Sequence, residues 1–131
     1  MERGAYLADH VALCTACHSE YDMSTFENVG PKGAGGTVEG SHGEDDDLEY
    51  AAPNLTSDPT GVTGKLSEDA FVARLKGGRA YASSIMPWEA FKQLTDDDAR
   101  SIYRYLRSLP PVKHDTGPGY RKVGWKPGDA P

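Results

Sequence analysis

The sequence predicts a small, mainly helical domain whose helices are joined by long irregular segments. Three stretches carry helical patterns or capping residues, at residues 2–17, 67–78 and 95–111. A length of 131 residues suits a single domain. The fifteen glycines and nine prolines indicate long irregular segments, which are tolerable where they wrap a bound group.

The first stretch, residues 2–17, has one apolar stripe. Tyr6, Leu7, Val11 and Cys14 recur at spacings of three and four residues, which is the helical period. We therefore expect a helix that packs through this stripe.

The two later stretches are marked at both ends. Ser67 and Thr95 are good N-caps, and acidic residues follow each of them, where they interact favourably with the helix dipole. A glycine pair at 77–78 and a proline pair at 110–111 end the two helices.

Between the first and second helices, residues 21–65 lack helical periodicity. We expect a long loop there, with a short hairpin near Thr37 and Val38. The acid run at 44–47 has no EF-hand spacing, so we interpret it as a solvated face rather than a cation site.

Residues 14–18 read Cys-Thr-Ala-Cys-His, which is the most informative motif of the chain. Two cysteines with a two-residue spacer can form thioethers to both vinyl groups of one haem, and the next histidine then lies below the iron. Cys14 and Cys17 are thus the expected attachment sites of one haem c, and His18 is its expected axial ligand.

Three other interpretations of this motif remain open. A thioredoxin-like thiol pair would need a βαβ context and leaves the histidine unexplained. A structural zinc site needs four ligands, and the chain has only two cysteines and four histidines at spacings that match no usual zinc pattern. A disulfide would close only a small loop and would add little stability.

The second axial ligand separates electron transfer from ligand chemistry. Met86 is distant from the motif and is followed by Pro87, which favours an extended backbone and stiffens the segment that carries the thioether. We expect Met86 to bind the iron, with a histidine or an open position as alternatives. The other candidates are Met23, His10, His42 and His114.

Charge is distributed unevenly along the chain. Residues 1–64 carry two basic and twelve acidic side chains, a net charge of −10, whereas residues 65–131 carry twelve basic and eight acidic, a net charge of +4. The acidic half argues against nucleic acid as a partner.

No stretch approaches the roughly 20 apolar residues of a membrane span, and the N-terminus lacks the pattern of a secretory signal. We therefore expect a soluble chain without a membrane span. Covalent haem attachment normally takes place outside the bacterial cytoplasm, so we expect a periplasmic or otherwise extracytoplasmic fragment without its export signal. Such a fragment could belong to a membrane-associated subunit.

Several further short motifs accompany the 14–18 motif. They are Gly4 and Tyr6, Pro53-Asn54-Leu55-Thr56-Ser57-Asp58, Thr60-Gly61, Met86-Pro87-Trp88, Leu94-Thr95-Asp96 and Tyr105-Leu106. Together these motifs resemble those of class I c-type cytochromes over residues 4–112. More narrowly, the stretches at 53–61 and 86–96 are similar to the monohaem cytochrome domains and subunits of bacterial periplasmic dehydrogenases.

The resemblance implies an all-α cytochrome c fold with three to four helices around one covalently bound haem and long irregular loops. It implies that the first and last helices cross at nearly right angles, with Gly4 allowing close approach of Tyr105 and with Tyr6 packed near Ile102. Residues 1–112 would form the cytochrome c domain, and residues 113–131 would form an extended C-terminal tail.

The resemblance also implies that a proline carbonyl accepts a hydrogen bond from the free nitrogen of His18. Pro53 is the expected acceptor, and Pro31 is the alternative. On charge and donor grounds, the candidate contacts of the haem propionates are Arg79, Tyr81 and Trp88.

The function these observations predict is single-electron transfer by a monohaem c-type cytochrome with His18 and Met86 on the iron. Such a protein is not itself an enzyme, and its partners would be redox proteins such as a dehydrogenase, a terminal oxidase or another cytochrome. A five-coordinate haem sensor or peroxidase-type domain is the main alternative, and a non-haem CxxC redox module is the second.

Overall fold

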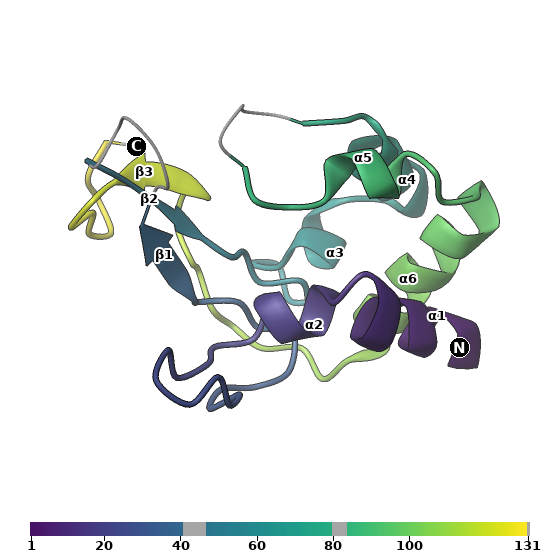
Figure 1. The fold of residues 1–131 in the computed structure, drawn as a ribbon, viewed down its shortest axis with the longest axis horizontal. Coiled ribbons are helices and arrows are strands. Elements are labelled where there is room, and N and C mark those ends of the chain that lie inside the picture. The colour runs from purple at the N-terminus through teal and green to yellow at the C-terminus, as the bar shows by residue number, and fades with distance from the viewer. Residues whose placement is uncertain (41–46, 80–83, 131) are drawn as a thin grey trace.

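A computed structural model describes residues 1–40, 47–79 and 84–130 (Figure 1). Helices gather on one side of the molecule, a small sheet lies on the other, and the two termini lie at opposite ends (Figure 1). The helices are α1 (Glu2–Tyr6), the π-helical turn η1 (Leu7–Val11), α2 (Cys14–Cys17), α3 (Val62–Lys65), α4 (Glu68–Lys76), α5 (Trp88–Phe91) and α6 (Asp96–Ser108). The strands are β1 (Val38–Gly40), β2 (Leu48–Ala51) and β3 (Tyr120–Lys122).

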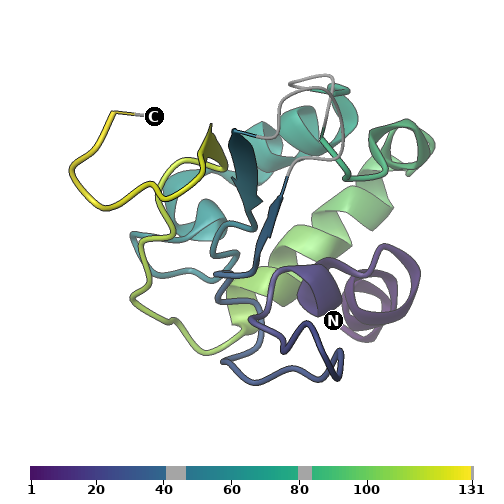
Figure 2. The same ribbon diagram turned by 60° about the vertical axis from the view of Figure 1, so that its left-hand side comes forward.

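The expectation of an all-α fold with three to four helices is wrong. The described residues form six α-helices and one π-helical turn, together with a three-stranded antiparallel sheet of order β1-β2-β3. Figure 2 shows the strands side by side, away from α1. β1 begins at Val38, where the sequence suggested a hairpin, but β3 comes from the C-terminal tail.

Side-chain pairs between β2 and β3 explain why such short strands associate. Glu49 lies opposite Arg121, and its carboxylate is 2.9 Å from the Arg121 guanidinium, with both side chains largely buried. Tyr50 lies opposite Tyr120, with ring centroids 5.3 Å apart. Cross-strand pairs of this kind stabilise a sheet whose strands are too short to show a periodic pattern.

The N-terminal helix follows its expected stripe only in part. Leu7 and Ala8 are buried, whereas Tyr6 and Val11 are 55% and 53% exposed. The Ala12 amide bonds to the Leu7 carbonyl five residues earlier, and this wider turn rotates the residues after it relative to a regular helix. The expectation that Tyr6 packs near Ile102 is therefore wrong, and its ring lies beside that of His10 instead.

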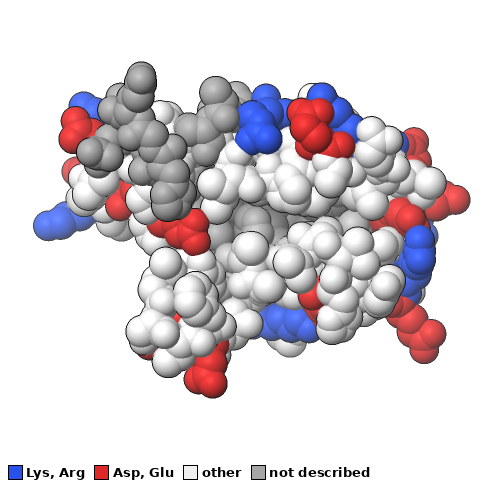
Figure 3. All heavy atoms as spheres, viewed as in Figure 1, with Lys and Arg blue, Asp and Glu red and all other residues white. Residues whose placement is uncertain are grey.

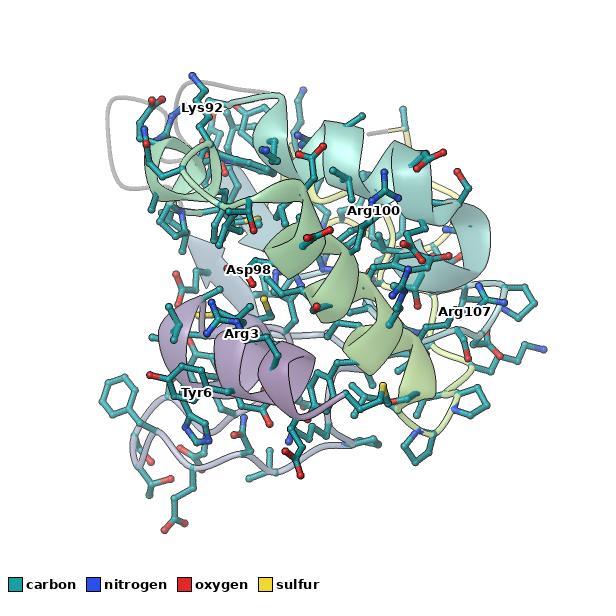
Figure 4. The ribbon with its side chains drawn as sticks, turned by 90° about the vertical axis from the view of Figure 1, so that its right-hand side faces the viewer. Arg3, Tyr6, Lys92, Asp98, Arg100 and Arg107 are labelled. Atoms are coloured by element: carbon teal, nitrogen blue, oxygen red, sulfur yellow. The ribbon has the colours of Figure 1, made fainter. Side chains whose placement is uncertain are left out.

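Helix α1 crosses α6 at close range (Figure 4). Gly4 permits this approach, because a Cβ atom there would lie 2.1 Å from the Ser101 carbonyl oxygen and 3.0 Å from the Tyr105 Cβ. Arg3 and Asp98 form a two-pronged ion pair across the same crossing, with both distances 2.9 Å (Figure 4). The sequence-based expectation for Gly4 and Tyr105 is confirmed.

Helices α4 and α6 begin at the expected caps. The Ser67 hydroxyl accepts the Ala70 amide proton at 3.2 Å, and the Thr95 hydroxyl accepts that of Asp98 at 3.1 Å. Helix α6 forms the centre of the core with four buried side chains. These are Ala99, Ile102, Tyr103 and Leu106, and their neighbours include Leu7, Phe71, Leu75 and Phe91.

Within the described ranges, no helix has the length and apolar character needed to cross a bilayer.

Candidate functional site

A large apolar cleft lies between the α2 side of the molecule and the segment that runs into α5. Its volume is about 1390 Å³, including the solvent at its mouth. Figure 3 shows this face hollowed, with mainly uncharged side chains along the hollow. Its apolar walls include Leu55, Val62, Phe71, Leu75, Phe91 and Leu106.

Both cysteines of the motif line this cleft from α2. They are free thiols rather than a disulfide, with Cys14 partly buried and Cys17 exposed. Burial raises the pKa of the Cys14 thiol to about 12, and burial and the Glu39 carboxylate raise the pKa of Cys17. Both sulfurs are therefore uncharged at neutral pH.

The turn into α2 is fixed by local contacts around the motif. Leu13 adopts a left-handed conformation with φ of 57°, which turns the chain sharply between η1 and α2. The Thr15 hydroxyl donates to Asp9 at 2.5 Å, and the other oxygen of Asp9 accepts from Lys32 and Tyr105, each at 2.7 Å. This network ties the motif to α6, because Tyr105 belongs to that helix.

His18 lies in the same wall and is buried. Its Nδ1 is 2.9 Å from the Pro53 carbonyl oxygen, and since a carbonyl can only accept, Nδ1 carries the proton. Burial lowers the pKa of His18, with a smaller opposing effect of the bond to Pro53. The imidazole is thus neutral and has Nε2 as its basic nitrogen, the form that a metal requires.

Met86 lines the cleft from the segment that precedes α5. Figure 1 shows this segment opposite α2. It is partly buried and packs against the core. Trp88 supports this segment, because its indole N–H donates to the Ser84 hydroxyl at 2.9 Å. The fold therefore brings Cys14, Cys17, His18, Pro53, Met86 and Trp88 to one cleft.

Of the three predicted propionate contacts, Trp88 alone is a described residue that lines the cleft. Arg79 is exposed and donates to the Ser84 carbonyl, and it does not line the cleft. Tyr81 lies outside the described residues. Trp88 lines the cleft, but its indole N–H is already bonded to Ser84.

The other candidate ligands lie away from the cleft or outside the described residues. Met23 is 54% exposed, and neither it nor His10 lines the cleft. His114 Nδ1 bonds to the Ala34 carbonyl at 2.9 Å. His42 falls outside the described residues. The Pro31 carbonyl accepts the Ala34 amide at 3.2 Å, and His18 bonds to Pro53 instead.

The sequence did not single out several polar residues of the cleft, among them Arg74, Tyr21 and Glu39. Arg74 of α4 lines it, and its guanidinium lies 4.4 Å from the centroid of the Trp88 ring. Tyr21 donates to Glu39 at 2.5 Å, a bond that raises the pKa of Tyr21 to about 12. In the sequence these residues are scattered on a helix face and in a loop, so no spacing pattern could have grouped them.

The residues present fit a c-type haem. The walls are mostly apolar, as a porphyrin plate requires, and two sulfurs and a neutral imidazole open onto the same space. Among residues 1–40, 47–79 and 84–130, no group of three or more His, Cys, Asp or Glu side chains could hold a metal ion.

Comparison with known proteins identifies relatives of one kind, although no family model matches the chain. The chain is 35% identical over 122 residues to the cytochrome c subunit of alcohol dehydrogenase (quinone) from Gluconacetobacter polyoxogenes, covering 88% of this chain and 25% of that subunit. It is 32% identical over 121 residues to the fructose dehydrogenase cytochrome subunit of Gluconobacter japonicus, covering 88% and 23%. It is 32% identical over 116 residues to the gluconate 2-dehydrogenase cytochrome c subunit of Pantoea cypripedii, covering 83% and 26%.

The chain thus spans about a quarter of the length of these relatives. The resemblance that the sequence motifs indicated is confirmed over most of the chain, and the chain is a homologue of the cytochrome c subunits of bacterial dehydrogenases.

Proposed function

We propose that this chain is a monohaem c-type cytochrome domain that transfers single electrons between redox proteins. The observation that carries the proposal is the convergence of Cys14, Cys17, His18 and Met86 on one apolar cleft. Cys14 and Cys17 would hold the haem as thioethers, and His18 and Met86 would be the axial ligands of its iron. The bound haem supplies a one-electron couple between the ferric and ferrous states.

The protein residues set the conditions for this couple. The Pro53 carbonyl fixes the tautomer of His18 and makes Nε2 a better donor. A methionine ligand raises the reduction potential relative to a second histidine. The apolar walls exclude water and so disfavour the additional charge of the oxidised state.

Electrons would enter and leave near Cys17, because this cysteine is exposed at the edge of the cleft. Transient docking of a partner protein at this edge would suffice for transfer, so the domain needs no substrate pocket of its own. For the haem carboxylates we propose Arg74, because its charge lies at the cleft, together with Tyr81 from the contacts expected on the sequence. Arg79 and Trp88 are less suitably placed, since Arg79 does not line the cleft and the Trp88 indole N–H already donates to Ser84.

The relatives also support a proposal about the redox partners of this chain. They are cytochrome subunits of dehydrogenases, so we propose a dehydrogenase and a downstream electron acceptor as partners. The chain would act as an electron-transfer part of such a complex rather than as an enzyme. Haem c attachment implies an extracytoplasmic, periplasmic location. Residues 1–112 would be the cytochrome c domain, with residues 113–131 as its C-terminal extension.

Absorption spectra of both redox states test the cofactor and its ligands together. We expect the spectrum of a c-type haem and, in the ferric protein, the weak far-red band that reports methionine sulfur on iron. Haem staining of a denaturing gel tests covalent attachment, since a thioether-linked haem stays with the polypeptide. A chain without haem stain would return the CxxC redox module to consideration.

The variant Met86→Ala tests the second axial ligand. Loss of the Met86 sulfur should leave the haem attached through Cys14 and Cys17, remove the far-red band and lower the reduction potential. Met23→Ala is the matched control, because Met23 is exposed and away from the cleft, and it should change none of these properties. An unchanged spectrum in Met86→Ala, or ready carbon monoxide binding by the parent ferrous protein, would favour the five-coordinate alternative.

A further inference from the structure

The segment after α6 runs behind the loop that carries Pro53. The Asn54 side-chain amide donates to the Val112 carbonyl at 2.7 Å and to the His114 carbonyl at 3.2 Å. The Thr60 hydroxyl accepts the His114 amide proton at 3.0 Å. The segment after α6 is thus hydrogen-bonded to Asn54, the residue that directly follows Pro53.

Asn54 is completely buried and uses both ends of its carboxamide. Its oxygen accepts the Thr56 amide at 2.9 Å and the Thr56 hydroxyl at 2.8 Å, while its nitrogen donates to the C-terminal segment. A buried amide with all its groups paired holds its surroundings in one arrangement, because each alternative leaves a polar group unsatisfied.

The same segment holds the other end of this loop. It continues to Gly119, whose carbonyl accepts the Ala51 amide proton at 3.0 Å, and then enters β3, which pairs with β2. Residues 51–54 are therefore bound to the C-terminal segment both before and after Pro53. Gly119 also lines the cleft.

Gly35 also lies directly against the Pro53 peptide. A Cβ atom on Gly35 would lie 2.4 Å from the Ala52 carbonyl oxygen and 2.5 Å from the Pro53 carbonyl carbon, so only glycine permits this approach. The Gly35 amide also donates to the His18 carbonyl at 2.7 Å. The peptide that faces His18 thus packs against Gly35 and is held by the bonds of Asn54.

We propose that Asn54, together with Val112–His114 of the C-terminal segment, is a positioning element for the proximal ligand His18. Its bonds hold the Pro53 carbonyl against Nδ1–H, and this hydrogen bond sets the donor strength of Nε2. The proposal rests on the proposed function, because it gives the C-terminal segment a part in tuning the haem potential.

Exchange of the His18 Nδ1 proton with solvent, measured by NMR on the ferrous protein, tests this proposal together with the reduction potential. Asn54→Asp keeps the oxygen that binds Thr56 but removes the amide donor to Val112 and His114. Asn54→Ala removes the oxygen as well as the donor. We expect the proton to exchange at least tenfold faster in both variants. The potential should rise, because a weaker Pro53 bond makes Nε2 a poorer donor to the ferric state.

Thr63→Ala is the matched control. Thr63 is also completely buried, but its side-chain hydrogen bond goes to the Leu55 carbonyl, at 2.8 Å, and not to Pro53 or the C-terminal segment. This variant should lose stability without changing proton exchange or potential. If Asn54→Ala does not fold, Asn54→Asp decides alone.

Unchanged exchange and potential in the folded Asn54 variants would overturn the proposal. Equal changes in Thr63→Ala would also overturn it, because they would indicate general loosening. The parent protein's haem stain and far-red band test the proposed function separately. A parent protein that lacks both would overturn the proposed function and this proposal together, whereas unchanged exchange in the variants of a haem-stained protein overturns this proposal alone.

Discussion

Gly4→Ala should destabilise the protein through the crossing of α1 and α6. An alanine Cβ at this position would lie 2.1 Å from the Ser101 carbonyl oxygen, whereas ordinary contacts of this kind begin at 3.4 Å. The shortfall exceeds 1 Å, and the obstacle is helix backbone rather than a flexible side chain. The two helices must therefore move apart, which also disturbs Leu7 and Ala8 in the core.

Two opposing effects determine the magnitude of this change. Overpacking of a well-packed contact costs about 1–3 kcal/mol. Alanine in place of glycine within a helix returns about 0.5–1 kcal/mol. Because the overlap exceeds 1 Å, the packing cost lies in the upper part of its range, about 2–3 kcal/mol. We therefore expect a net loss of about 1–2.5 kcal/mol in the free energy of unfolding, or a melting temperature lower by about 3–12 °C for a chain of this size.

Urea and thermal unfolding of the haem-loaded protein, followed by circular dichroism, would measure this loss. Gly40→Ala is the control, because a Cβ there meets no atom of the described residues within 4 Å, and it should change stability by less than about 0.5 kcal/mol. A Gly4→Ala protein as stable as the parent would refute the reasoning, since it would mean that the helices cross without the close contact described.

Three further changes probe the caps, the core and the acid response. Thr95→Ala removes the N-cap of α6 and should lower the free energy of urea unfolding by about 1 kcal/mol, and Thr95→Ser should restore it. Equal stability of the parent and both variants would contradict the role of Thr95 as the cap. Tyr103→Phe leaves the Leu66 carbonyl without its 2.8 Å donor and should lower the free energy of unfolding by about 1 kcal/mol in the same assay. A Tyr103→Phe protein more stable than the parent would contradict a stabilising role of this hydrogen bond. Burial raises the pKa of Asp9, but its hydrogen bonds, led by that from Lys32, lower it below the usual 3.8 overall. The unfolded chain then binds more protons, so this contribution to stability is present above about pH 4 and is lost as the pH falls through the folded pKa. Asp9→Asn should flatten this acid loss in unfolding curves between pH 6 and 3, and an unchanged slope would exclude Asp9 as its source.

The long helices were predictable because their determinants are local. The N-caps at Ser67 and Thr95 bond to amides three residues ahead, so the residues that start each helix are adjacent in the sequence. Glycine and proline pairs after α4 and α6 likewise act within one turn. Such signals do not depend on the rest of the fold.

The sheet was not predictable for the opposite reason. Each strand has three or four residues, too few for an alternating pattern to stand out. The partner of Glu49 in the sheet is Arg121, 72 positions later, in a tail whose composition suggests irregular chain. Only the tertiary fold brings these charges together. The sequence of residues 38–51 therefore indicated a loop with a hairpin, but it could not show that β1 is an edge strand and β2 the central strand of a sheet.

The candidate site shows the same division between local and distant determinants. Cys14, Cys17 and His18 are grouped by the motif itself, and Pro87 marks Met86. Arg74, by contrast, is an exposed charge on a helix, which in a sequence is indistinguishable from ordinary solvated lysines and arginines. Its relevance follows only from the position of α4 beside the cleft.

The state of the two thiols bears on which chemistry the motif can support. A cysteine that carries out thiol–disulfide exchange needs a lowered pKa, because the thiolate is the nucleophile. Here burial raises the pKa of Cys14 to about 12, and burial and Glu39 raise that of Cys17, so both sulfurs resist ionisation. An uncharged sulfur costs little to bury against an apolar wall, whereas a thiolate would be expensive there. A thioether keeps the sulfur uncharged, so the same wall that disfavours a redox-active thiol pair is suited to sulfurs that are bonded to a porphyrin.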